Sequence, residues 1–124
     1  MERHPMIVAG FGFRPGATLA ALQDALARAG GTDGVTHLAT LAVKAAGLEP
    51  LAQALELPVV ALAPEALHGV PTLTRSGRVE EMFGTGSLAE AAALAAAGQG
   101  ARLRGPRAVS ADGMATAAIA EGAV

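Results

Sequence analysis

Arg14 is the residue whose position most strongly indicates binding chemistry. It lies in a glycine-rich turn, residues 10–16, which follows an apolar run and precedes an amphipathic helical pattern. This order predicts a strand, a tight turn and the start of a helix, and ligands of open α/β sheets bind beyond the carboxyl ends of such strands. A guanidinium group placed there suits a small anion. Gly12 is a second predicted binding residue, although Gly10 and Gly12 could serve only to relieve crowding.

A second cation, Lys44, follows the next predicted strand, residues 37–41. If the two strands are parallel, Arg14 and Lys44 face the same crevice, with Thr40 as a neutral hydrogen-bond donor. Two unpaired cations repel each other, and an anion between them removes that repulsion. The pattern therefore predicts a carboxylate or phosphate ligand. The alternative is that Lys44 is a solvated lysine of a surface loop.

The segment from Gly84 to Ser87 opens an alanine-rich helix, and Ser87 with Glu90 has the spacing of a capping box. Capping alone explains that pair. The free amides at a helix amino terminus also attract anions, so we predict that Thr85, Gly86 and Ser87 contact the ligand. A phosphorylated metabolite is an alternative ligand that this turn suggests.

Three arginines, Arg102, Arg104 and Arg107, fall between residues 91 and 111, where the sequence contains no acidic residue. Arg102 and Arg104 alternate with Leu103, so on a strand they share one face. A solvated sheet face or a charged sheet edge explains these two. Arg107 lies closer to the turn that follows.

Several other kinds of site find little support. The turn at residues 10–16 lacks the G-x-G-x-x-G spacing of dinucleotide-binding proteins because Pro15 occupies the last glycine position. The histidines, His4, His37 and His68, are scattered and there is no cysteine, so we predict no metal site. No order of serine, histidine and aspartate around a nucleophile elbow is visible. We expect no cofactor.

The elements that must position these residues follow from hydrophobic periodicity. Strands are predicted at residues 6–11, 37–41 and 58–62, with helices at 17–29 and 48–55 between them. A short helix at 79–83 and a longer one at 87–97 follow, and strands at 101–109 and 114–120 form a hairpin. The predicted fold class is α/β, with three layers, a mainly parallel sheet flanked by helices and a C-terminal antiparallel hairpin.

The composition is consistent with one domain over residues 1–124, which is long enough to bury its own core. Hydrophobic residues make up 52% of the chain and the net charge is −2. So small a charge argues against broad binding to nucleic acid or to an anionic membrane. Since residues 1–5 lead into an apolar run too short for a signal peptide, we expect a cytoplasmic protein without membrane spans.

Four segments together resemble the family of CobE and the C-terminal domain of the CbiG cobalamin-biosynthesis proteins: residues 10–16, 40–44, 84–94 and 115–120. CbiG proteins open a δ-lactone on a cobalt-precorrin and carry further domains upstream. The resemblance implies a precorrin or corrinoid acid as ligand, whose acetate and propionate groups Arg14, Lys44 and Arg107 would meet. It also implies lactone hydrolysis, for which Glu90 and Glu80 are the candidates to activate water.

An alternative function is that of a non-catalytic carrier or partner module, which passes an unstable intermediate between enzymes of the corrin pathway. The resemblance to a stand-alone domain and the lack of a paired acid and base in the sequence favour it.

Overall fold

A six-stranded sheet forms the middle layer of the structure. The computed structural model describes residues 6–123, and its strands are β1 (Ile7–Phe13), β2 (His37–Leu41), β3 (Val59–Leu62), β4 (Arg102–Leu103), β5 (Ala108–Val109) and β6 (Ala115–Glu121). They lie in the order β3-β2-β1-β6-β4, with β5 also paired to β6. β1, β2 and β3 are parallel, whereas β6 is antiparallel to β1, β4 and β5. The predicted α/β class with its C-terminal hairpin is confirmed.

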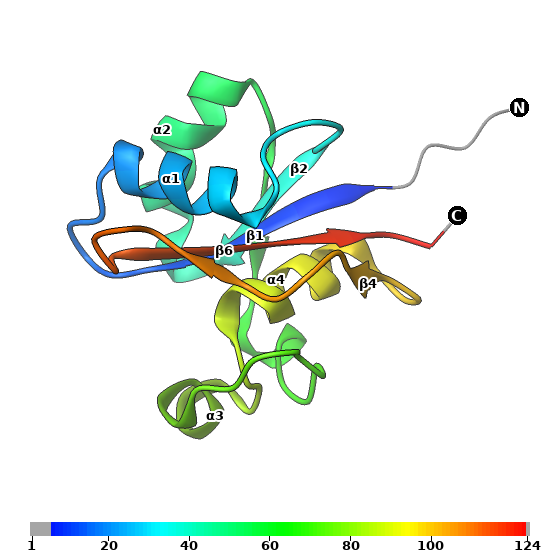
Figure 1. Cartoon of the computed structure of the whole chain (residues 1–124). Helices are drawn as coiled ribbons and strands as arrows, with labels where there is room; N and C mark the ends of the chain where they lie inside the picture. The colour runs from blue at the N-terminus through cyan, green and yellow to red at the C-terminus, as the bar shows by residue number, and fades with distance from the viewer. Residues whose placement is uncertain (1–5, 124) are drawn as a thin grey trace, which may run out of the picture.

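Helices cover both faces of this sheet (Figure 1). α1 (Leu19–Ala29) and α2 (Ala45–Leu55) lie on one face, and α4 (Leu88–Ala97) lies on the other. Between β3 and α4 the chain makes an excursion that contains the short 3₁₀ helix η2 (Pro64–Ala66) and α3 (Gly77–Phe83). Within residues 6–123, no helix has both the length and the apolar character required to cross a bilayer.

Two elements differ from the prediction by more than two residues. The expected strand at 101–109 is divided into β4 and β5, because Pro106 has no amide hydrogen to donate to a neighbouring strand. The second helix begins earlier than predicted, and a 3₁₀ turn, η1 (Ala42–Lys44), leads into it directly. Lys44 is therefore part of a helical entry turn rather than of an extended loop.

The close contact of α4 with β1 depends on small side chains. A side chain at Gly10 would collide with the backbone of α4, at the carbonyl oxygen of Ala89 and the amide nitrogen of Ala93. Ala89 and Ala93 are themselves completely buried. The alanine-rich sequence of α4 thus lets the helix approach the sheet closely, which places its amino terminus next to the end of β1, where Leu88 lies beside Gly12.

Asp24 on α1 holds the hairpin turn before β6. Its Oδ2 atom accepts a hydrogen bond of 2.7 Å from the amide of Ala111, and its carboxylate also accepts from Nε of Arg28 at 3.0 Å. The Ala111 amide and, after it, Arg28 lower the pKa of Asp24 below its ordinary value of 3.8. The Ser110 hydroxyl and the Met114 amide lower the pKa of Asp112, in the same turn, in the same way.

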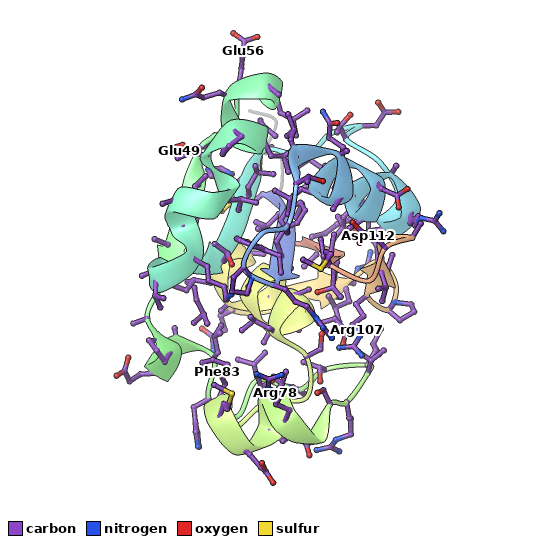
Figure 2. All side chains as sticks on the ribbon, turned by 90° about the vertical axis from the view of Figure 1, so that its left-hand side faces the viewer. Glu49, Glu56, Arg78, Phe83, Arg107 and Asp112 are labelled. Atoms are coloured by element: carbon purple, nitrogen blue, oxygen red, sulfur yellow. The ribbon has the colours of Figure 1, made fainter. Side chains whose placement is uncertain are left out.

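We expect these carboxylates to make the stability pH-dependent. A carboxyl group whose pKa is lowered in the folded state stabilises the fold above its unfolded pKa, and this stabilisation is lost as the pH falls through the folded value. Asp24→Asn should therefore lower the urea midpoint at neutral pH and reduce its fall between about pH 7 and about pH 3. Glu49→Gln, an exposed position on α2 (Figure 2), is the control. An unchanged pH profile in Asp24→Asn would contradict the assignment.

Candidate functional site

A groove of about 330 Å³ opens at the carboxyl end of β1. Its walls come from the end of β1, from α3, from the first residue of α4 and from the hairpin between β5 and β6. Three arginines line it, namely Arg14, Arg78 and Arg107. Figure 2 shows Arg78 and Arg107 on the same face of the molecule, with α3 below them. Segments far apart in the sequence therefore bring three guanidinium groups to one site.

These three arginines differ from the other arginines of residues 6–123 in their partners. Arg28, Arg75, Arg102 and Arg104 each form an ion pair with a carboxylate of the fold. Within the same range, Arg14, Arg78 and Arg107 form none. The groove thus gathers cations whose charge the described part of the chain leaves uncompensated, and such clusters are favourable when an anion binds.

The floor of the groove is apolar. Phe13, Val79, Leu88 and Met114 contribute to its surface. Gly12 is buried there, and Thr116 on β6 donates to its carbonyl oxygen at 3.1 Å. A Cβ at Gly12 would lie only 3.0 Å from the Thr116 hydroxyl oxygen and in ordinary contact with Leu88, so the absence of a side chain at Gly12 leaves more room at the floor. Apolar surface surrounded by guanidinium groups suits a ligand that has a hydrophobic body and acidic substituents.

Lys44 lies beside this groove rather than in it. Its ammonium group donates to the carbonyl oxygen of Phe13 at 2.7 Å and lies 5.2 Å from the centre of the Phe13 ring. Arg14 and Lys44 are therefore at the same end of β1, but the ring of Phe13 lies next to the lysine. Lys44 thus contacts Phe13 and adds a positive charge at this end of β1.

The predicted hydroxyl donors have partners inside the fold. Thr40 is buried and donates to the Phe11 carbonyl at 2.9 Å, and Thr85 donates to the Val70 carbonyl at 2.6 Å. Ser87 caps α4 by accepting from the amide of Glu90 at 3.4 Å. Gly86 is buried against Thr72 and Thr74. None of the predicted residues Thr40, Thr85, Gly86 and Ser87 lines the groove, and we leave them out of the proposed site.

The two candidate general bases are also engaged elsewhere. The Glu90 side chain does not reach back to Ser87 as in a capping box; it accepts four hydrogen bonds, from Leu73, from Thr74 twice and from Arg107. Glu80 forms an ion pair with Arg75. Glu80 lines a different cavity, of about 470 Å³, between η2 and α3.

That second cavity is larger but has the wrong charge for an acidic ligand. Glu65, Glu80 and Glu81 all line it, together with His68. Within residues 6–123, no group of three or more histidine, aspartate or glutamate side chains could hold a metal ion. His4 lies outside the described residues. The arginine groove is therefore the candidate site for an anion.

Arg78 is a groove residue that was not predicted from the sequence. It lies one residue before the short helix predicted at 79–83, and its neighbours in the sequence suggested only a polar loop. Its place in the groove depends on how the excursion between β3 and α4 folds back toward β1. The sequence gives no signal for its role, because Arg78 precedes Glu80 and Glu81, and only the structure shows that Glu80 pairs with Arg75 instead.

Comparisons with known proteins agree with the fold and identify relatives. The family model described as "Cobalamin synthesis G C-terminus" matches residues 7–120. The crystal structure of CobE, a protein from the cobalamin (vitamin B12) biosynthetic pathway, is 33% identical, with a TM-score of 0.79 over 98% of this chain and 93% of that chain. The cobalamin biosynthesis protein chiG from Agrobacterium tumefaciens str. C58 is 40% identical, with a TM-score of 0.71 over 96% of this chain and 100% of that chain.

A more distant structure shares the fold alone. A cobalamin biosynthesis protein G homolog from Sulfolobus solfataricus is 15% identical, with a TM-score of 0.72 over 96% of this chain and 37% of that chain. A search of curated protein sequences gave no significant match.

Proposed function

Because the chain belongs to the cobalamin synthesis G C-terminus family and thus to the proteins of cobalamin biosynthesis, we propose that it binds a corrinoid polycarboxylate in the arginine groove. Precorrins and corrinoid acids are macrocycles with an apolar ring body and acetate and propionate substituents. The proposed contacts are Arg14, Arg78 and Arg107 with the carboxylates, and the apolar floor beside Gly12 with the ring body.

The observation that supports this proposal most directly is that the described arginines fall into two groups, those paired with carboxylates and those that line the groove. Four described arginines pair with carboxylates of the fold, while the remaining three meet in one groove. A hydrogen bond between charged groups contributes about 1.5–3 kcal/mol, so several such bonds give useful affinity even where solvent reaches the site. α4 adds to this, since its amino terminus, at Leu88, lies at the groove and carries a partial positive charge.

Between hydrolysis and carriage of the ligand, we favour carriage. A general base must reach the water that it activates. The Glu90 carboxylate is occupied by four donors, and the Glu80 carboxylate is paired with Arg75 at another cavity. We therefore propose that this chain binds and presents the intermediate, and that other enzymes of the corrin pathway are its partners. Turnover of a lactone-bearing precorrin by the purified chain would decide for hydrolysis instead.

The direct test is a titration followed by visible absorption. Dicyanocobyrinic acid has free carboxylates, and its heptamethyl ester has the same ring without the charges. We expect the acid to bind and the ester to bind far more weakly, with an affinity for the acid that falls as salt is added. Equal binding of the two compounds would show that the arginines do not recognise the ligand. Tighter binding of simple nucleotides would favour the phosphorylated metabolite instead.

Arg14→Ala should weaken binding of the acid by about 10- to 150-fold, the value of one charged hydrogen bond, with little change in melting temperature. Arg14 is exposed and forms no ion pair with a described carboxylate, so the fold does not depend on its side chain. Isothermal titration and thermal unfolding measure the two effects separately. Loss of stability with unchanged affinity would mean that Arg14 is structural.

A further inference from the structure

Glu90 is a completely buried carboxylate on α4 that connects two separate segments of the chain. Its Oε1 atom accepts hydrogen bonds from the amides of Leu73 and Thr74 at 2.7 and 2.9 Å. Its Oε2 atom accepts from the Thr74 hydroxyl at 3.0 Å and from the amide of Arg107 at 2.7 Å. Burying a charge is unfavourable unless it is hydrogen-bonded, and here four donors satisfy it.

Both segments carry an arginine of the groove. The first runs from Thr74 through Ser76 into α3, where Ser76 accepts from the amide of Val79 and its own amide donates to the Gly86 carbonyl at 2.7 Å. Arg78, the second residue of α3, therefore follows four residues after the Glu90 contact at Thr74. The second segment is bonded to Glu90 at Arg107 itself. One side chain thus fixes the backbone on two walls of the site.

These walls depend on such a connection because their other hydrogen bonds, such as that from Ser76 to Gly86, join them mainly to neighbouring loops rather than to the sheet. Neighbouring guanidinium groups repel each other when no ligand is bound, which favours a wider groove. The excursion that carries Arg78 contains only η2 and α3, and the segment that carries Arg107 lies between two strands of two residues each. Short elements with few backbone bonds to a sheet open easily. Figure 1 shows how far α3 projects from the sheet.

We propose that Glu90 is a positioning residue that sets the separation of Arg78 and Arg107, so that the groove accepts a ligand with carboxylates on two sides of its body. Arg78 is then a specificity-determining residue on the wall formed by α3. This inference rests on the proposed function, because it assigns the geometry with which the groove holds the same acidic ligand. It gives Glu90 a part in binding without contact with the ligand.

Glu90→Gln tests the connection without ligand. The amide side chain keeps one acceptor oxygen but replaces the other with a donor, so it cannot accept from all of Leu73, Thr74 and Arg107. In native-state hydrogen exchange we expect faster exchange on at least one of the two walls. Glu49→Gln, the same change at an exposed position of α2, is the matched control. Unchanged protection on both walls would overturn the proposal.

A double-mutant cycle tests the effect on binding. Dicyanocobyrinic acid is titrated into the wild type, Glu90→Gln, Arg107→Ala and the double variant. If Glu90 acts through Arg107, the double variant should lose at least about threefold less affinity than the product of the single losses. The salt dependence of binding should also become shallower in Glu90→Gln, because fewer cations meet the ligand. Full additivity with an unchanged salt dependence would overturn the positioning role.

The outcomes separate this inference from the proposed function. Failure of the wild type to bind the acid overturns the proposed function and with it the role of Glu90 in binding. Normal binding by the wild type, with an additive cycle and an unchanged salt dependence, overturns the role of Glu90 alone. If Glu90→Gln does not fold, Thr74→Val replaces it, since that variant removes a single donor at nearly constant shape. In a cycle of Thr74→Val with Arg78→Ala, we then expect the double variant to lose less affinity for the acid than the product of the single losses. Full additivity in that cycle would count against the proposal.

Discussion

Gly10→Ala is expected to destabilise the protein by about 3 kcal/mol or more, the upper range for overpacking a buried site. The added methyl group would overlap the backbone of α4 at Ala89 and Ala93, and a helix backbone cannot move aside as a flexible side chain can. The helix would have to shift away from β1 as a whole. Because small domains are stable by only about 5–15 kcal/mol, this is a large fraction of the total.

The measurement is the urea midpoint, with Gly77→Ala as the matched control. Gly77 begins α3, and nothing lies within 4 Å of an added methyl group there. Alanine favours helices over glycine by about 1 kcal/mol, so the control should be neutral or slightly stabilising. Similar destabilisation by both variants would mean that the close approach of α4 to β1 is not what requires glycine at position 10.

The largest effect on binding is expected from removing two groove arginines together. Arg14 and Arg107 come from opposite ends of the chain and line the same cavity. If each forms one charged hydrogen bond with the ligand, the double variant Arg14→Ala/Arg107→Ala should lose about 3–6 kcal/mol, or about 10²- to 10⁴-fold in affinity. Titration of dicyanocobyrinic acid at low salt gives this number.

Arg102→Ala/Arg104→Ala is the control for total charge. It also removes two cations, but both of these pair with Glu121 outside the groove, at 3.9 and 2.8 Å. We expect its affinity for the acid to stay close to that of the wild type at moderate salt. A comparable loss in both double variants would indicate that the ligand responds to net charge rather than to the groove.

Much of the fold was predictable because its signals are local. Runs of apolar residues predicted β1 to β3, spacings of three and four predicted α1, and the helix-favouring alanine run predicted α4, with boundaries close to those observed. The strand at residues 101–109 was predicted as continuous, and the interruption at Pro106 divides it. The early start of α2 was missed because the preceding residues 42–47 have no clear apolar period.

The groove was predictable only in part, for a physical reason. Gly12 lies near the end of β1 and Arg14 follows that strand directly, so sheet topology alone places them. Arg78 and Arg107 reach the same groove through an excursion and a bend whose course depends on tertiary contacts, above all those of Glu90. Sequence spacing indicated the Ser87 cap but not the longer-range partners of the Glu90 carboxylate, which come from residues about 17 positions away on either side.

The pairing of the first and last strands has a consequence for how the molecule assembles. β6 lies in the interior of the sheet, and its register joins Ile7 to Glu121 and Phe13 to Ala115. During synthesis, β1 therefore gains its second neighbour only after residues 115–121 have emerged. Contacts so distant in sequence slow folding, because a long loop must close before they form. We therefore expect the groove beside β6 to form after the parallel half of the sheet.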